Sequence, residues 1–238
     1  MLRWRPGIPH SVRYRVLKVT YNGEVRVGGP SDTRELDGLI VTKIAVGPMD
    51  NNAYLLRCAS TGQGLLIDAA NEPGRLIEMI GDTPVGTILT THRHPDHWQA
   101  LPEVQKHTGA VVVAHPADAD ELPVPVGRRA ENGEVLTFGD ATVSLIHLRG
   151  HTPGSLAVLY DAGGRLAGSP HVFTGDSLFP GGVGKTNSAE DFTSLLTDVT
   201  ERLFGPLPDA TWVYPGHGND TTLGAERPHL AEWSQRGW

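Results

Sequence analysis

The chain has 238 residues, of which 39% are hydrophobic and 20% charged, and its formal net charge is −7. No apolar run approaches the roughly 18 residues that a membrane-spanning helix needs, and an acidic chain is poorly suited to neutralising nucleic-acid phosphates. The N-terminus lacks the apolar stretch of a secretory signal, and the single cysteine, Cys58, cannot form an internal disulfide. We therefore expect a cytoplasmic protein without a membrane or nucleic-acid partner, and the sequence does not predict its oligomeric state.

Residues 1–36 differ from the rest of the chain because they are richer in arginine and contain one strongly alternating stretch. Residues 12–27 (VRYRVLKVTYNGEVRV) alternate apolar and polar side chains on both sides of Asn22 and Gly23. An Asn-Gly pair favours the two-residue turn of a β-hairpin, because both residues tolerate a positive φ angle. The GGPSDTREL segment that follows is typical of a linker. The sequence therefore predicts a β-hairpin extension over residues 1–36 and a main domain over residues 37–238.

The main domain alternates short β-prone runs with amphipathic helices. Runs rich in Val, Ile, Leu and Thr and bounded by Gly, Pro or Asn predict strands. These are residues 39–46, 53–58, 64–69, 87–91, 111–115, 134–138, 142–148, 155–160, 171–175 and 211–214. Helices are predicted at residues 72–81, 97–108 and 189–203 and after Thr222. Ser188 and Asp191 form a capping box for the third helix, and the alternation as a whole is typical of a layered α/β fold.

One loop concentrates metal-binding side chains. Residues 91–97 (THRHPDH) follow a predicted strand and hold the imidazoles of His92, His94 and His97. The same loop holds the carboxylate of Asp96. Imidazole and carboxylate together suit zinc, iron, manganese or nickel, whereas an all-oxygen set would favour magnesium or calcium. A polar surface turn with incidental histidines is the alternative, and the residues further along the chain argue against it.

Three further segments carry the same residue types at the ends of predicted strands: GHTPGS with His151, FTGDSLF with Asp176 and YPGHG with His217. Together with the histidine loop they resemble the five-part ligand pattern of the metallo-β-lactamase superfamily, over roughly residues 39–225. The resemblance implies a four-layer αβ/βα sandwich, in which two mixed sheets pack together with helices outside. It also implies a metal site at one edge of the sandwich and a metal-dependent hydrolase.

The resemblance assigns the ligands by their positions in the pattern. The first metal ion is expected to be held by His92, His94 and His151. The second is expected to be held by Asp96, His97 and His217, and Asp176 is expected to bridge the two. Many true β-lactamases carry cysteine or serine at the bridging position, so Asp176 points away from antibiotic hydrolysis. We expect two zinc ions, and iron or manganese would also suit these ligands.

Two cations in such a site would lower the pKa of a shared water, so that a metal-bridging hydroxide attacks the substrate at neutral pH. Asp96 is expected to hold or accept the proton of this hydroxide, which makes it the predicted catalytic residue. His115, His147 and His171 lie in or beside predicted strands, where packing or hydrogen bonding is the expected role. The predicted reaction is the hydrolysis of a small-molecule thioester or ester.

Residues 175–186 (GDSLFPGGVGKT) resemble the glyoxalase II group, whose motif has a lysine after a similar glycine turn. In that group the lysine contacts the thiol carrier, so Lys185 is expected to bind a substrate carboxylate. A solvated loop lysine is the alternative. Glyoxalase II proper continues past its last histidine into a helical thiol-binding domain, whereas 21 residues follow His217. Glutathione specificity is therefore not expected, and the sequence does not name the thiol carrier.

Other groups of the superfamily supply alternative functions. Persulfide dioxygenases use equivalents of His92, His151 and Asp176 as a mononuclear iron site, but tend to carry arginine at the position of Lys185. Lactonases carry a tyrosine where this chain has Phe179, which has no hydroxyl. Nuclease relatives add a nucleic-acid domain or a basic surface, which this acidic chain lacks. A mononuclear-iron, persulfide dioxygenase-like oxidoreductase is therefore the alternative prediction.

Overall fold

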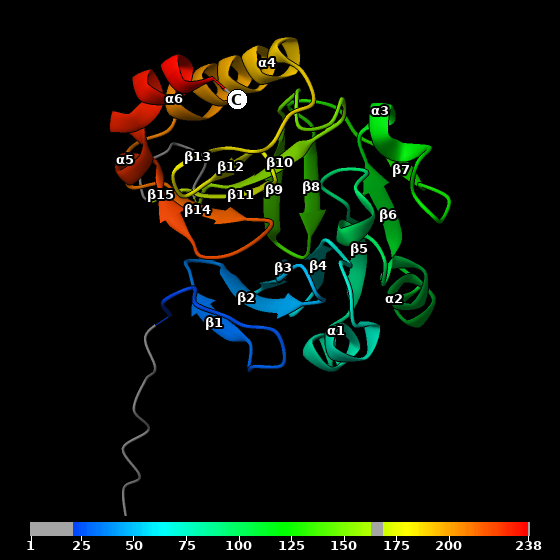
Figure 1. The fold of residues 1–238 in the computed structure, drawn as a ribbon. Helices are drawn as coiled ribbons and strands as arrows, with labels where there is room; N and C mark the ends of the chain where they lie inside the picture. The colour runs from blue at the N-terminus through cyan, green and yellow to red at the C-terminus, as the bar shows by residue number, and fades with distance from the viewer. Residues whose placement is uncertain (1–20, 163–168, 238) are drawn as a thin grey trace, which may run out of the picture.

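Two β-sheets packed face to face form the centre of the protein (Figure 1). The computed structural model describes residues 21–162 and 169–237. The first sheet contains, in hydrogen-bonded order, β1 (Asp32–Glu35), β2 (Leu39–Val46), β3 (Asn51–Cys58), β4 (Gly64–Ile67), β5 (Val85–Leu89), β6 (Val111–Ala114) and β7 (Arg128–Arg129). The second runs in the order β15 (Thr221–Thr222), β14 (Trp212–Pro215), β11 (His171–Gly175), β10 (Leu156–Tyr160), β9 (Ala141–His147) and β8 (Val135–Phe138).

Helices cover the outer face of each sheet (Figure 1). Those that pack on the first sheet are α1 (Pro73–Ile80) and α2 (Leu101–Thr108), with the short α3 (Pro116–Ala119) after β6. Those that pack on the second sheet are α4 (Ala189–Val199), α5 (Leu223–Glu226) and α6 (Leu230–Arg236). Short helical turns span Pro95–His97, Thr200–Phe204 and Arg227–His229, and β12 (Leu178–Phe179) pairs with β13 (Gly182–Val183). This arrangement confirms the predicted four-layer sandwich.

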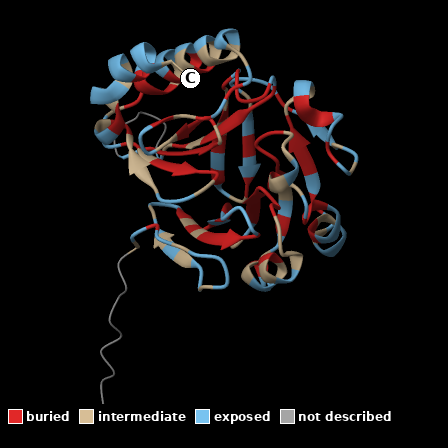
Figure 2. Cartoon of the chain, in the orientation of Figure 1, coloured by how far each residue is buried: buried red, intermediate tan, exposed pale blue. Residues whose placement is uncertain are grey.

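The central strands are buried on both faces, which is why they appear in the sequence as nearly continuous apolar runs. Side chains alternate between the two faces of a strand. Leu65 and Ile67 of β4 therefore lie in the core between the sheets, while Leu66 packs under the helices of the first sheet. On the other side, Leu195 and Val199 of α4 pack on the second sheet. In Figure 2 the buried residues gather in the strands at the centre of the protein, while the outer helices carry many exposed residues.

Two predicted helices differ in how closely they match the structure. The capping residue of α4 is confirmed, because the hydroxyl of Ser188 accepts a hydrogen bond of 3.0 Å from the backbone N–H of Asp191. The helix predicted at residues 97–108 is shorter than expected. Its first part is a separate turn at Pro95–His97, and α2 begins only at Leu101, one residue before Pro102. A proline in the first turn of a helix is well tolerated there, because its missing N–H would have had no partner.

The predicted N-terminal hairpin is not formed in the part of it that the structure describes. Residues 12–20 lie outside the described residues, and residues 21–27 contain no strand. Gly23 has a φ of 73°, but Asn22 is not among the residues with a positive φ, as a two-residue hairpin turn would require. Part of the predicted linker is instead β1, which pairs with β2 of the main domain. The boundary after residue 36 stays a prediction, and this pairing crosses it.

A buried ion pair ties residues 21–23 to the other end of the chain. The ammonium of Lys43 lies 2.6 Å from the carboxylate of Asp220, and both side chains are almost fully buried. Lys43 also donates hydrogen bonds to the carbonyls of Gly23 and Gly218, at 2.7 and 2.8 Å. The hydroxyl of Tyr21 donates to Asp220 at 2.6 Å. These contacts fix the segment that follows β14.

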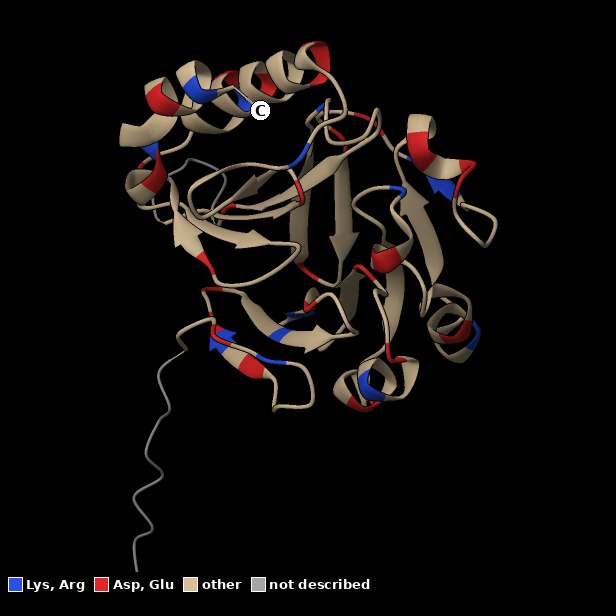
Figure 3. Ribbon diagram, viewed as in Figure 1, with Lys and Arg blue, Asp and Glu red and all other residues tan. Residues whose placement is uncertain are grey.

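The outer helices carry charges of both signs (Figure 3). Arg75 and Glu78 lie on α1, and Glu103 and Lys106 lie on α2. Within residues 21–162 and 169–237, no helix combines the length and the apolar character that crossing a membrane would take.

We predict that Lys43→Met lowers the free energy of unfolding by about 3–5 kcal/mol, because it leaves a buried carboxylate without its cation. Denaturant unfolding of the metal-free protein measures the change. The double variant Lys43→Met/Asp220→Leu removes both charges and is expected to recover a large part of the loss. A double variant as unstable as the single one would show that the ion pair is not the cause.

Candidate metal centre

All seven predicted ligands lie in segments that follow strands, and these segments meet at one edge of the sandwich. The histidine loop follows β5, and His151 lies between β9 and β10. Asp176 directly follows β11, and His217 follows β14. Strands of both sheets therefore bring together residues that are far apart in the sequence.

The first set consists of His92, His94 and His151 and has the spacing of a metal site. The Nδ1 atom of His94 lies 3.1 Å from Nε2 of His92 and 2.9 Å from Nε2 of His151. The Nε2 atoms of His92 and His151 are 3.2 Å apart. Nitrogen ligands at 2.0–2.1 Å around a tetrahedral zinc ion lie about 3.3 Å from one another. The three imidazoles therefore fit one cation.

The second set consists of Asp96, His97 and His217. Nε2 of His217 lies 3.3 Å from Oδ2 of Asp96 and 3.3 Å from Nε2 of His97. The remaining edge, from Nε2 of His97 to Oδ2 of Asp96, is 3.5 Å. This triangle has nearly the same dimensions as the first set, so it also suits one cation.

Asp176 lies between the two sets, where a bridging ligand is predicted. Its Oδ2 atom is 3.6 Å from Nε2 of His151 and 3.4 Å from Nε2 of His217. Its Oδ1 atom is buried without a hydrogen-bond partner and lies 3.3 Å from Nε2 of His97. A buried carboxylate oxygen of this kind is costly unless a cation or a proton compensates it. Gly216 leaves room for it, because a Cβ there would lie 2.2 Å from Oδ1.

Hydrogen bonds to backbone carbonyls orient two of the histidines toward the centre. The Nδ1–H of His151 donates to the carbonyl of Lys185 at 2.6 Å, and that of His217 donates to the carbonyl of Met49 at 2.8 Å. A neutral imidazole that donates through Nδ1 has its lone pair on Nε2. In both rings this is the atom that faces the other ligands.

Asp68 belongs to the site, although the sequence analysis did not single it out. It follows β4 and is buried. Its carboxylate accepts hydrogen bonds from Thr91, through the backbone N–H at 2.7 Å and the hydroxyl at 2.8 Å, and from Nδ1 of His97 at 2.8 Å. The Thr91 hydroxyl in turn lies 3.0 Å from Nδ1 of His92 and can accept its proton. Asp68 thus orients one ligand of each set. In the sequence, the signal that could have identified Asp68 is a single charged residue directly after an apolar strand.

The first set is electrostatically suited to donate lone pairs. Burial lowers the pKa of His92 well below its ordinary value, and the neighbouring His97 lowers it further. Burial also lowers the pKa values of His94 and His151. These imidazoles are therefore neutral at pH 7, which is the form that binds metal.

The second set is surrounded by carboxylates and holds its protons more tightly. Burial alone would lower the pKa of His217, but hydrogen bonds to Asp176 and Asp96 outweigh it and raise the pKa to about 10. Burial alone would raise the pKa of Asp176, but the neighbouring His97 and His217 hold it well below its usual value. A cation in this set competes with a proton, so its binding is expected to release one.

His115, His147 and His171, which were not predicted as ligands, lie outside the ligand sets. His115 and His147 stack on each other with ring centroids 3.9 Å apart. Nδ1 of His171 lies 3.0 Å from the hydroxyl of Tyr214. Each therefore has a local partner of the kind that the sequence predicted.

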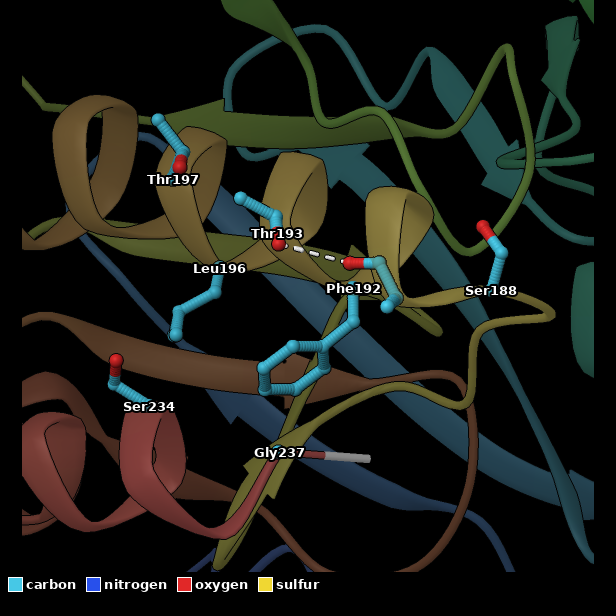
Figure 4. Close-up of a pocket in the computed structure, with 8 residues that line it drawn as sticks. Ser188, Phe192, Thr193, Leu196, Thr197, Ser234 and Gly237 are labelled. Atoms are coloured by element: carbon cyan, nitrogen blue, oxygen red, sulfur yellow. Dashed lines mark hydrogen bonds between the residues drawn. The ribbon is translucent and has the colours of Figure 1, made fainter.

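A groove between α4 and α6 lies apart from the ligands (Figure 4). Phe192 and Leu196 of α4 line its apolar part, together with Gly237, and its volume is about 440 Å³. Figure 4 shows both side chains directed from α4 toward the C-terminal segment. None of the seven predicted ligands lines this groove, so the chemistry is assigned to the edge of the sandwich.

The chain belongs to the metallo-β-lactamase superfamily, whose family model matches residues 46–217. This superfamily binds divalent metal ions and is generally hydrolytic, in agreement with the predicted class. A hydroxyacylglutathione hydrolase of Fuscovulum blasticum is 34% identical over 172 residues, which cover 71% of this chain and 62% of that protein. The chain thus spans less than two thirds of that relative.

Two solved structures share the fold. BLEG-1 B3 metallo-β-lactamase has a TM-score of 0.71 and 28% identity, over 80% of this chain and 97% of that one. ETHE1 from Myxococcus xanthus has a TM-score of 0.68 and 27% identity, over 80% of this chain and 82% of that one. The proteins similar to this chain are named as different kinds of protein. The residues of the site, rather than the fold, must therefore guide the choice of reaction.

We predict that Asp68→Asn weakens metal binding in both sets by about 10–100-fold, because partners of this kind fix the orientation of metal ligands. Competition with a chromophoric chelator measures the affinities. Asp120→Asn is the control, since Asp120 is an exposed carboxylate paired with Arg129. Unchanged affinities in the Asp68 variant would remove this residue from the site.

Proposed function

We propose that the protein is a two-metal hydrolase that acts on a small-molecule thioester or ester. The observation that carries this proposal is the pair of equal-sized ligand sets with Asp176 between them. The similarity to a hydroxyacylglutathione hydrolase supports a thioester in particular. The small-molecule substrate and the location in the cytoplasm are parts of the proposal.

The first set would hold one divalent cation and the second set another, with Asp176 within reach of both. Bound cations of this kind lower the pKa of water and polarise a carbonyl group. Asp96 would accept the proton of the attacking water, since its side chain is 17% exposed and water can therefore reach it. Zinc is proposed because imidazole and carboxylate ligands suit it, and iron or manganese would fit the same donors.

Lys185 is proposed to bind a carboxylate of the substrate at the rim of the metal centre. Its carbonyl is held by His151, which fixes the start of its side chain beside the first set. The preceding residue, Gly184, packs directly against the backbone of Asp176, because a Cβ there would lie 1.7 Å from the carbonyl oxygen of Asp176. This contact brings Lys185 close to the metal centre. Lys185 is exposed, so a substrate bound at the metal centre can reach it. These features favour an acidic substrate.

A mononuclear-iron, persulfide dioxygenase-like reaction is the second candidate. His92, His151 and Asp176 converge as two imidazoles and one carboxylate, which is the donor set of many non-haem iron oxygenases. The equally convergent second set would have no role in that reaction, and this favours hydrolysis.

We predict two metal ions per chain in protein purified without added metal. Elemental analysis measures both their number and their identity. One iron per chain with little zinc, together with oxygen uptake on a persulfide, would replace hydrolysis by the second candidate.

We predict that Lys185→Ala raises the KM for an acidic thioester about tenfold or more and leaves kcat nearly unchanged. An ionic contact remote from the reacting bond stabilises the bound substrate and the transition state alike. A charged hydrogen bond contributes about 1–3 kcal/mol, which corresponds to this change. Steady-state kinetics with matched acidic and neutral thioesters is the measurement. Equal KM values for the two substrates in the parent protein would contradict the assigned role.

A further inference from the structure

Two buried polar side chains outside the ligand sets hold the segments that carry the ligands. Asp118 lies in α3 and Asn51 begins β3, and each is 1% exposed. We propose that Asp118 positions the first set and Asn51 the second, so that each set can be weakened without the other. The proposal rests on the two-metal site of the proposed function and adds which residues determine the affinity of each half.

The carboxylate of Asp118 joins the two loops that supply the whole first set. It accepts hydrogen bonds from the backbone N–H of Arg93 at 3.1 Å and of Gly154 at 2.9 Å, and from the hydroxyl of Thr152. Arg93 separates the first two ligands of this set, and Thr152 directly follows the third. All three hydrogen bonds therefore go to residues that flank the first set.

The residues that surround Asp118 in space leave room for its carboxylate. A Cβ at Gly154 would lie 2.7 Å from Cγ of Asp118, so only glycine leaves the space at this position of the GHTPGS segment. The guanidinium of Arg93 lies 4.0 Å from the carboxylate and partly balances its charge. A buried carboxylate that accepts hydrogen bonds from several N–H and O–H groups is held rigidly. It therefore fixes the positions of the two loops that donate to it.

Asn51 makes the corresponding contacts with the second set. Its side-chain N–H donates to Oδ2 of Asp96 at 2.7 Å and lies 3.4 Å from Nε2 of His217. Its backbone forms an isolated β-bridge with His217, and the N–H of the next residue, Asn52, donates to the carbonyl of Gly216 at 2.7 Å. Asn51 therefore aligns a carboxylate ligand and a histidine ligand of the same set.

The two supports act from different elements on different ligands. Asp118 reaches the first set from α3, and Asn51 reaches the second set from β3. Asp176, in contrast, contacts both sets, and Asp68 contacts His97 directly and His92 through the hydroxyl of Thr91. Variants of the shared residues are thus expected to weaken both metals, whereas variants of Asp118 and Asn51 each weaken one.

The test compares Asp118→Asn and Asn51→Leu in the full-length, zinc-loaded protein. Equilibrium dialysis against graded free Zn²⁺ yields two dissociation constants. The ring N–H signals of His151 and His217, observed by NMR, identify the site to which each constant belongs, because the two rings belong to different sets and each donates to its own backbone carbonyl. Glu226→Gln is the matched control, since Glu226 is a buried carboxylate that accepts a backbone N–H and a threonine hydroxyl away from the ligands.

We expect Asp118→Asn to raise the dissociation constant at the His151 site by about 10–100-fold and to leave the His217 site unchanged. Asn51→Leu is expected to show the reverse, and the control to change neither. Equal weakening of both sites by either variant, or of neither, overturns the inference while the two-metal function stands. A parent protein that binds one ion overturns both. If Asp118→Asn does not fold, Thr152→Val removes one of the three contacts and must still act on the His151 site alone.

Discussion

The geometry of the candidate metal centre depends on one buried carboxylate, that of Asp68, and on its hydrogen bonds. A charged group at this depth is unfavourable unless its oxygens are fully engaged, and here Thr91 and His97 engage them. Because Thr91 in turn contacts His92, the same carboxylate orients one imidazole in each ligand set. The buried charge of Asp68 thus helps to fix the positions of the two neighbouring ligand sets relative to each other.

The sandwich determines where those triangles can form. Parallel strands β4, β5 and β6 of the first sheet end at one edge, and the parallel pair β11 and β14 of the second sheet ends beside them. Loops from both sheets therefore bring the predicted ligands to one edge of the sandwich, while the helices occupy the outer faces. The packed apolar layers fix the positions of the strand ends, and the short loops that follow the strands direct their side chains toward the site.

The sequence predicted what depends on local patterns. The seven predicted ligands stood out because each lies in a short motif directly after a strand, and the cap at Ser188 because its partner is three residues away. Asp118 and Asn51 gave no such signal, since their partners are backbone groups and side chains far along the chain. The hairpin is the opposite case, because its local signal was strong but residues 21–27, the part that the structure describes, contain no strand. Alternation and an Asn-Gly pair describe a strand and a turn, but β1 formed where residues 32–35 could pair with β2.

The buried pair of Lys43 and Asp220 has a consequence for how this protein can diverge. Asp220 also accepts hydrogen bonds from Tyr21 and from the indole of Trp212, so one carboxylate serves partners from three distant parts of the chain. Replacement of a single member leaves an unsatisfied charge or donor in the interior. Among homologues these positions should therefore change as a group, with a neutral apolar residue at 43 accompanied by loss of the carboxylate at 220.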